Sequence, residues 1–170
     1  KEGTGVVTSK LLRLLKSSIL SVPEAAPLKL DKLWVGTDFS NPSKKSFTFA
    51  ENLRHQSSTQ LSAVHIYHVP MQFSPYVSSE DAVKKIEKHL EQKSAKFFKK
   101  STSPAPDHSQ LLFAKDKSVG DKFQIELQKQ KPDLLILSDK GSNNISSLLI
   151  GSLTEELFDE HLSCPLLVVK

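Results

Sequence analysis

The chain alternates short apolar runs with longer stretches in which apolar residues recur at helical spacing. The apolar runs lie near positions 33–36, 61–69, 111–114, 133–137 and 165–169. Consecutive apolar residues are typical of strands buried on both faces of a parallel sheet, and the amphipathic stretches between them are typical of crossover helices. The pattern therefore predicts an α/β fold, with five parallel strands and helices on both faces of an open sheet.

The helices are predicted from capping residues and from apolar periodicity. One begins near Pro42, and a long one opens at Ser79. Another carries Val119, Phe123 and Leu127 at the i, i+4, i+8 positions of one face, and a last one covers residues 152–161.

The first thirty residues resemble the end of the chain instead of continuing the alternation backwards. Residues 5–12 can be laid on residues 151–158, and Ile19–Val22 then falls on Pro165–Val168 without a gap. We interpret residues 1–22 as the tail of a preceding similar domain, residues 23–29 as a proline-stiffened linker, and residues 30–170 as one domain. The alternative is an ordinary N-terminal helix packed on the sheet, because a short apolar repeat arises easily.

Composition narrows the class of protein and its partners. The 170 residues carry a net charge of +4, which is too mild to demand nucleic acid, and acidic residues interrupt the lysines of the long helix. The one cysteine, Cys164, cannot form an intrachain disulfide, so a reducing, cytoplasmic location is expected. No apolar run approaches the ~20 residues of a membrane helix.

The segment after the fourth predicted strand has the outline of a phosphate cradle. The strand ends in Ser138-Asp139-Lys140-Gly141, and Gly151-Ser152 follows after nine intervening residues, just before a helix. Small residues let the backbone approach a ligand, and the unpaired N–H groups and dipole of a helix start favour an anion. Gly141 and Gly151 could instead serve only tight turns.

Four landmarks together resemble the universal stress protein family. They are Val35-Gly36-Thr37-Asp38-Phe39-Ser40, His68-Val69, Gly151-Ser152, and the closing run from Cys164 to Val169. The resemblance spans residues 30–170. The nucleotide-binding members of this family carry a motif of Gly, two residues, Gly, nine residues, and then Gly-Ser or Gly-Thr. Here the first glycine is replaced by Ser138, whose side chain disfavours positive φ and would lower affinity if the loop needs that conformation.

The resemblance implies a Rossmann-like sheet of strand order 3-2-1-4-5, with a crevice where the winding reverses. It implies ATP or another adenine nucleotide as ligand, with Mg²⁺ bridging phosphate oxygens. Asp38 would contact the ribose or adenosine end, although it could also be a simple turn or cap acid. The implied nucleotide-binding residues are Thr37, Asp38, Val69, Ser138, Lys140, Gly141, Gly151 and Ser152.

The predicted function is a stress-response or signalling module that binds nucleotide and dimerises, as homodimer or tandem pair, through Leu166–Val169 at the sheet edge. No general base is evident beside a γ-phosphate, so any ATP hydrolysis should be slow. The alternatives are a ligand-free dimerisation module, in which Ser138 marks a lost site, and a genuine ATPase. We expect no metal held by protein ligands, because the histidines show no ligand spacing.

Overall fold

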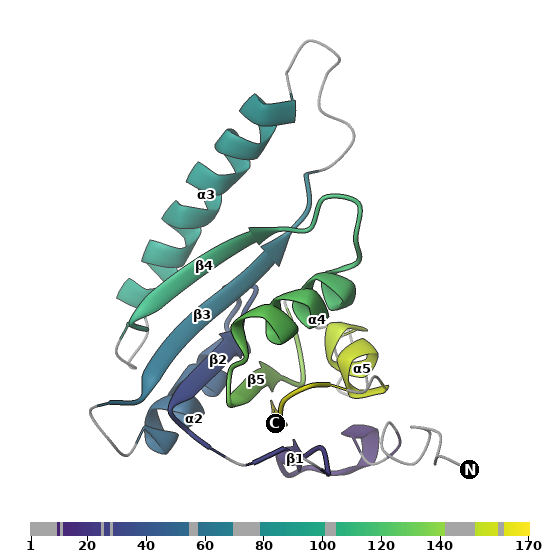
Figure 1. Cartoon of the computed structure of the whole chain (residues 1–170). Coiled ribbons are helices and arrows are strands. Elements are labelled where there is room, and N and C mark those ends of the chain that lie inside the picture. Colours follow the sequence, from purple (N-terminus) through teal and green to yellow (C-terminus); the bar gives the residue numbers. More distant parts are fainter. Residues whose placement is uncertain are drawn as a thin grey trace.

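The computed structural model describes residues 10, 12–24, 26–27, 29–54, 58–69, 79–100, 105–141, 152–159 and 162–170. Five strands and four helices follow the predicted alternation along the chain, and a further strand precedes them (Figure 1). In chain order the elements are β1 (Ile19–Ser21), β2 (Lys32–Gly36), α2 (Ser43–Leu53), β3 (Gln60–Tyr67), α3 (Ser79–Lys99), β4 (His108–Phe113), α4 (Val119–Gln130), β5 (Leu134–Ser138), α5 (Ser152–Asp159) and β6 (Leu166–Val169).

These strands form one mixed sheet of order β1-β6-β5-β2-β3-β4. Neighbours from β6 to β4 are parallel, whereas β1 runs antiparallel to β6, with Leu20 opposite Leu167. The prediction of five wholly parallel strands is therefore wrong in number and in overall order. The reason is that β6 would leave a row of backbone groups unpaired, and β1 pairs with them.

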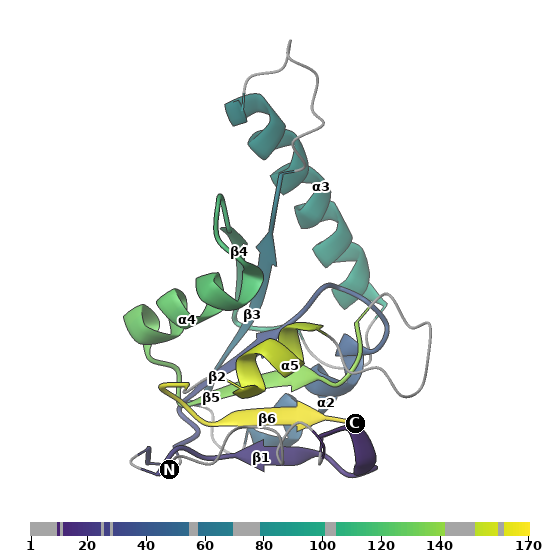
Figure 2. The ribbon, with the colours of Figure 1, turned by 90° about the vertical axis from the view of Figure 1, so that its right-hand side faces the viewer.

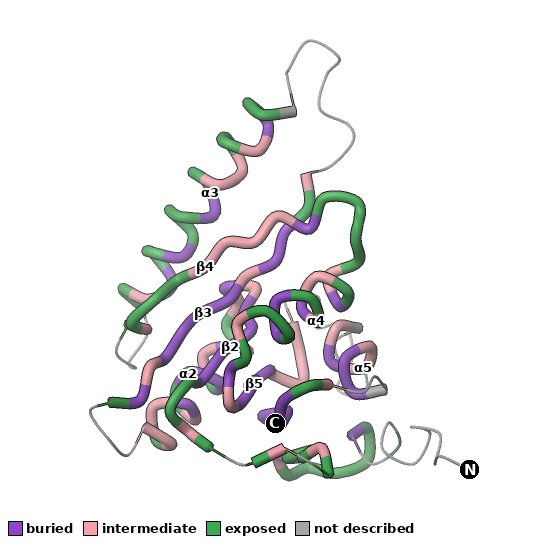
Figure 3. The backbone as a smooth tube through the Cα atoms, in the orientation of Figure 1, coloured by how far each residue is buried: buried purple, intermediate pink, exposed green. Residues whose placement is uncertain are grey.

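Each face of the sheet has its own apolar core, because alternate strand residues point to opposite sides. Trp34, Leu135 and Leu137 pack with α4 and α5 on one face, while Val35 and Ile136 pack with residues of α2 and α3 on the other. Figure 2 shows α4 and α3 on opposite sides of the strands, and Figure 3 shows burial concentrated in the sheet. The prediction of helices on both faces is confirmed.

Local capping places the helix that borders the candidate site. Ser118 is the N-cap of α4, and its hydroxyl oxygen accepts a hydrogen bond from the Asp121 N–H at 2.9 Å. This satisfies one of the donors that a helix start leaves unpaired. The apolar face predicted from Val119, Phe123 and Leu127 packs against the sheet, where Phe123 and Leu127 are buried.

No helix within the described ranges is long and apolar enough to cross a bilayer.

Candidate functional site

The turn after β2 is held by its own side chains. The Thr37 hydroxyl oxygen accepts a hydrogen bond from the Phe39 N–H at 2.9 Å, and the hydroxyl donates to the Ser43 Oγ at 3.0 Å. Asp38 Oδ1 accepts from the Ser40 N–H at 3.0 Å. Phe39 has a φ of 57°, an unusual value for a bulky residue, so the turn is held against a local conformational cost. These contacts fix where Asp38 lies.

Two side chains, one from β3 and one from α3, hold the same turn. His65 Nδ1 lies 2.6 Å from the Thr37 carbonyl oxygen, and Lys93 Nζ donates to the Asp38 carbonyl oxygen at 2.8 Å. Burial of the His65 ring lowers its pKa, so the neutral ring donates its Nδ1–H to Thr37 near pH 7. Phe39 packs on this ring with 5.0 Å between ring centroids. The loop that carries Asp38 is therefore held in place by contacts with His65 and Lys93.

The turn after β5 is closed by two hydroxyl groups. Ser138 Oγ donates to the Lys140 carbonyl oxygen at 2.6 Å, and Thr154 Oγ1, from α5, donates to the Ser138 carbonyl oxygen at 3.1 Å. Ser138 is the last residue of β5 and its φ is not positive, and neither is that of Gly141. In this conformation the loop does not need glycine at position 138 for its backbone angles.

The charged residues of this turn point in different directions. Asp139 Oδ2 lies 3.7 Å from Lys170 Nζ, and both side chains are largely buried. Lys140 instead lines a cavity. The acid that would repel a phosphate group is thus paired with Lys170, and Lys140 contributes the positive charge beside the cavity.

The cavity has a volume of about 270 Å³ and lies beyond the carboxyl ends of β2 and β5. The chain leaves β2 toward β3 on one side and leaves β5 toward β6 on the other, so the cavity sits where the winding of the sheet reverses, as ligand crevices of α/β sheets do. Its lining residues are Gly36, Thr37, Asp38, His65, Ile66, Val119, Phe123, Leu137, Ser138, Lys140, Gly141, Leu153 and Thr154.

Gly141 brings the two turns of this lining close together. A Cβ atom built on Gly141 would lie 3.3 Å from Asp38 Oδ2, closer than most Cβ contacts. The turns after β2 and β5 therefore meet at Asp38 and Gly141, and a larger residue at position 141 would press on the Asp38 carboxylate.

Five of the eight residues predicted for nucleotide binding line the cavity: Thr37, Asp38, Ser138, Lys140 and Gly141. Val69 lies two residues beyond β3 and is not among the lining residues. Gly151 lies outside the described residues; Ser152 begins α5, although its side chain is not described. The Asp38 contact to the Ser40 N–H shows that Asp38 is also the turn acid considered as an alternative.

Sequence reasoning missed several lining residues, of which His65, Ile66 and Thr154 are the most informative. His65-Ile66 repeats the histidine-aliphatic pair of His68-Val69 three residues earlier. Gly36 pairs in register with Val64, so this earlier pair is the one that reaches the end of β2. A register count from the glycine at the end of the first predicted strand could have found it.

No group of three potential metal ligands occurs among the residues that the structure describes. Burial raises the pKa of the Cys164 thiol to about 11, so the thiol stays protonated near neutral pH. Neither observation adds a catalytic group to the cavity.

Comparison with known proteins places the chain in a family. The family model for the universal stress protein family matches residues 29–170. A curated universal stress protein of Methanocaldococcus jannaschii is 23% identical over an alignment of 156 residues, and the match covers 82% of this chain and 81% of that protein. The fold and the family match agree, and the chain belongs to the universal stress protein family.

Solved structures share the fold at low sequence identity. Universal stress protein UspA from Lactobacillus plantarum matches 84% of this chain and 99% of its own, at a TM-score of 0.58 and 15% identity. A protein from Pseudomonas aeruginosa PAO1 matches 96% of this chain and 56% of its own, at a TM-score of 0.65 and 16% identity. The chain thus spans just over half the length of the second protein.

Proposed function

We propose that this protein is a stress-response or signalling module that binds ATP or another adenine nucleotide in the cavity between the ends of β2 and β5. The observation that carries the proposal is the meeting of the two turns, one with Asp38 and one with Ser138, Lys140 and Gly141, around a cavity at the winding reversal. A location in the cytoplasm belongs to the proposal, since the one cysteine is buried and unpaired.

The cavity wall suits the parts of such a ligand. Ile66, Val119, Phe123, Leu137 and Leu153 supply apolar surface that would pack against a flat base. The Asp38 carboxylate would accept hydrogen bonds from ribose hydroxyls. The phosphates would bind to the turn at Ser138, Lys140 and Gly141 and to the chain at Gly151 and Ser152, where α5 begins. Mg²⁺ would be held mainly by phosphate oxygens.

Slow ATP hydrolysis is the most that we propose as an activity. Asp38 is the only carboxylate in the described lining, and its Oδ1 accepts the Ser40 N–H. The His65 Nδ1 donates to the Thr37 carbonyl oxygen and burial lowers the pKa of the ring, so its remaining nitrogen, Nε2, is a weak base for taking a proton from water. Steady-state phosphate release that disappears in a Gly141→Val variant is the result that would establish an ATPase instead.

Pairing through the last strand is a second part of the proposal. Leu166–Val169 was expected to lie at a sheet edge, but β1 occupies that edge, so pairing of β6 with another chain would require β1 to leave. We propose that β1 is the last strand of a preceding similar domain and that the two domains pair through β1 and β6. Leu14, Leu20 and Val22 are 78%, 44% and 46% exposed, and a preceding domain would cover them.

A ligand-free interaction module is the competing function, and one observation favours it. The Ser138 hydroxyl already binds the Lys140 carbonyl oxygen, so the turn is satisfied without an anion. In this alternative the pairing of β1 with β6 is the activity and the cavity is a remnant.

Equilibrium titration distinguishes the two functions. Calorimetric titrations with ATP, ADP, AMP and adenosine, each with Mg²⁺, are compared with GTP as a control for base specificity. Saturable binding of an adenine nucleotide that is lost in Gly141→Val supports the nucleotide module. Absence of binding up to millimolar concentrations with every adenine ligand assigns the protein to the ligand-free alternative.

A further inference from the structure

The segment Leu12–Ser21, here called the N-terminal strap, contacts the domain at more points than the β1 ladder. Leu12 is fully buried and belongs to the apolar core that also contains Leu157 and Phe158 of α5. Figure 2 shows the strap beside β6, at the same edge of the sheet as the C-terminus. The strap is therefore packed against α5 as well as paired to β6.

Lys170 joins the strap to the turn after β5. Its backbone N–H donates to Ser18 Oγ at 3.3 Å, and its Nζ donates to the Leu12 carbonyl oxygen. The same Nζ lies 3.7 Å from Asp139 Oδ2. Asp139 stands between Ser138 and Lys140, which both line the cavity. One ammonium group thus contacts the strap and the candidate phosphate turn together.

A second ion pair reaches the opposite wall of the cavity. Arg13 of the strap pairs with Glu155 of α5 at 2.6 Å. The neighbouring residues Leu153 and Thr154 line the cavity, and Thr154 Oγ1 donates to the Ser138 carbonyl oxygen. The strap therefore contacts α5 directly and the turn after β5 through Lys170, while Thr154 and Ser138 join these two walls by their own hydrogen bond.

We propose that Lys170 is a positioning residue that couples the docking of the N-terminal strap to the conformation of the turn Ser138–Gly141. When the strap is docked, Lys170 is held by Leu12 and Ser18, and its ammonium group draws the Asp139 carboxylate away from the cavity. When the strap leaves, Lys170 loses the Leu12 and Ser18 contacts that place its ammonium group, so the Asp139 carboxylate is no longer held away from the cavity and its negative charge opposes an anionic ligand. Strap docking and anion binding therefore favour each other, and the coupling is reciprocal.

The part of this inference that concerns ligand affinity rests on the proposed nucleotide site, whereas the coupling between strap and turn does not. The first experiment therefore uses no ligand. Hydrogen exchange is measured on peptides covering residues 12–22 and 136–141 in the parent, in Asp139→Asn, in Lys170→Met and in Lys170→Arg. Lys45→Met, an exposed lysine on α2, is the control.

Asp139→Asn gives the sharpest test, because Asp139 reaches the strap through Lys170. We expect exchange of the strap peptide to become roughly fivefold faster in Asp139→Asn and at least as much in Lys170→Met. Lys170→Arg should restore most of the protection, since it keeps the cation. The coupling would be overturned if, in Asp139→Asn, the peptide 136–141 exchanged faster than in the parent while the strap peptide 12–22 exchanged at the parental rate.

The second experiment tests the link to the ligand. In Arg13→Gln and Lys170→Met we expect the dissociation constant of the Mg-nucleotide to rise roughly fivefold, and saturating nucleotide should slow strap exchange in the parent by the same factor. If the parent binds no nucleotide, the proposed function fails while the exchange experiment still decides the coupling. If nucleotide binds but neither variant alters its affinity, the coupling to the ligand is wrong.

Discussion

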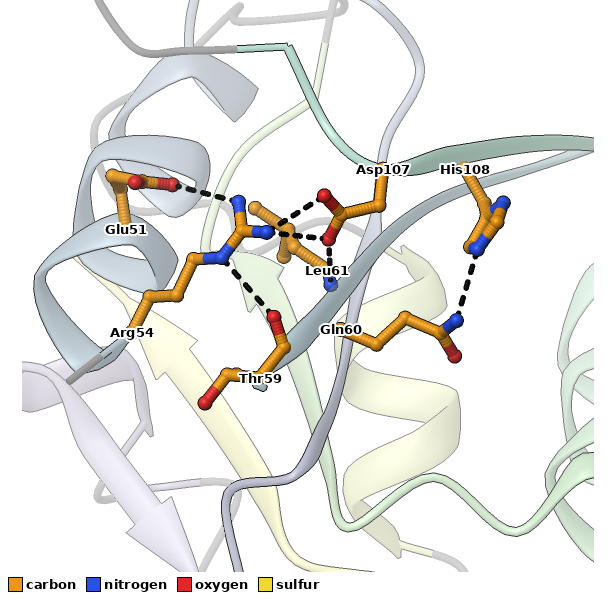
Figure 4. Close-up of polar contacts among 7 residues, drawn as sticks. All are labelled: Glu51, Arg54, Thr59, Gln60, Leu61, Asp107 and His108. Carbon is orange, nitrogen blue, oxygen red and sulfur yellow. Dashed lines mark hydrogen bonds and ion pairs between the residues drawn. The ribbon is translucent and has the colours of Figure 1, made fainter. Parts of the chain in front are cut away.

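The two ends of the sheet use similar polar residues in opposite ways. At the amino end, Arg54 follows α2 and Asp107 precedes β4, and their side chains close on each other (Figure 4). The Arg54 Nη2 donates to both Asp107 oxygens at 2.6 and 2.7 Å, while its Nε donates to the Thr59 carbonyl oxygen at 3.1 Å. At the carboxyl end, Asp38 and Lys140 instead border a cavity.

The difference separates a structural cluster from a candidate binding site. Asp107 also accepts the Leu61 N–H at 2.8 Å, so its carboxylate ties the start of β3 to α2 and β4. That backbone hydrogen bond and the Arg54 guanidinium lower the pKa of Asp107. Charges that satisfy one another hold strands together, whereas charges arranged around a cavity can bind a ligand. Variants at one end should therefore change stability, and variants at the other should change affinity.

The largest expected effect is on affinity at the carboxyl end. Gly141→Val should weaken nucleotide binding by about 100-fold or more, because its branched side chain would press on Asp38 and occupy the space between the two turns of the cavity. The free energy of unfolding should change little, since Gly141 is only partly buried and its φ is not positive. Calorimetric titration and urea unfolding of the same preparation check both statements. Parental affinity in this variant would place the ligand elsewhere.

The next largest effect is on stability at the amino end. Arg54→Met should lower the free energy of unfolding by about 2 kcal/mol, because it removes the charged hydrogen bonds to Asp107 and to the Thr59 carbonyl oxygen. Nucleotide affinity should be unchanged. Lys45→Met, on the exposed side of the same helix, serves as the matched control in urea unfolding. A loss of affinity equal to that of a cavity variant would erase the distinction between the two ends.

A smaller effect concerns pH. Because the pKa of Asp107 is lower in the folded state than in the unfolded state, its stabilising contribution is present above the ordinary aspartate value of about 3.9 and is lost as pH falls through the folded value. Asp107→Asn should therefore have a lower free energy of unfolding than the parent at pH 7. This gap between the two proteins should narrow below about pH 4. Urea unfolding at several pH values measures the gap. A gap of constant size would show that Asp107 does not act through its charge.

The smallest expected effect is at the residue that departs from the family pattern. Ser138→Gly should change nucleotide affinity by less than about threefold, because Ser138 lies in β5 without a positive φ. It should cost about 0.5–1 kcal/mol of stability, since glycine adds backbone freedom to a strand. An affinity that rises about tenfold or more would mean that binding requires a turn conformation that serine resists.

The sequence predicted the five parallel strands within a few residues, because four of them are buried and read as continuous apolar runs. β4 was expected from Leu111 but begins at His108, since this edge strand starts with exposed polar residues that carry no apolar signal. Residues 19–22 were matched to the last strand, but the position of β1 in the sheet was missed, because its partner β6 is distant in sequence. Tertiary pairing, which local patterns do not encode, decides both features.

The candidate site was predictable where a motif coincides with a strand end. Thr37, Asp38, Ser138 and Gly141 lie at a strand end or within three residues of one, so their place at the crevice followed from topology. Val69 was chosen from a dipeptide, and the register of β3 against β2 brings Ile66 to the cavity instead. The apolar wall from α4 was recognised as a helix face, but its contribution to the cavity depends on how α4 packs.

The most direct test of the two-ended account is a thermal-shift titration with Mg-ATP of three proteins side by side: the parent, Gly141→Val and Arg54→Met. At about 100 times the dissociation constant, binding should stabilise the folded state by about 2.7 kcal/mol, a rise of several degrees in Tm for a chain of this size. We predict a saturable rise in the parent, an equal rise from a lower starting Tm in Arg54→Met, and none in Gly141→Val. Equal rises in all three proteins, or none in the parent, would contradict the account.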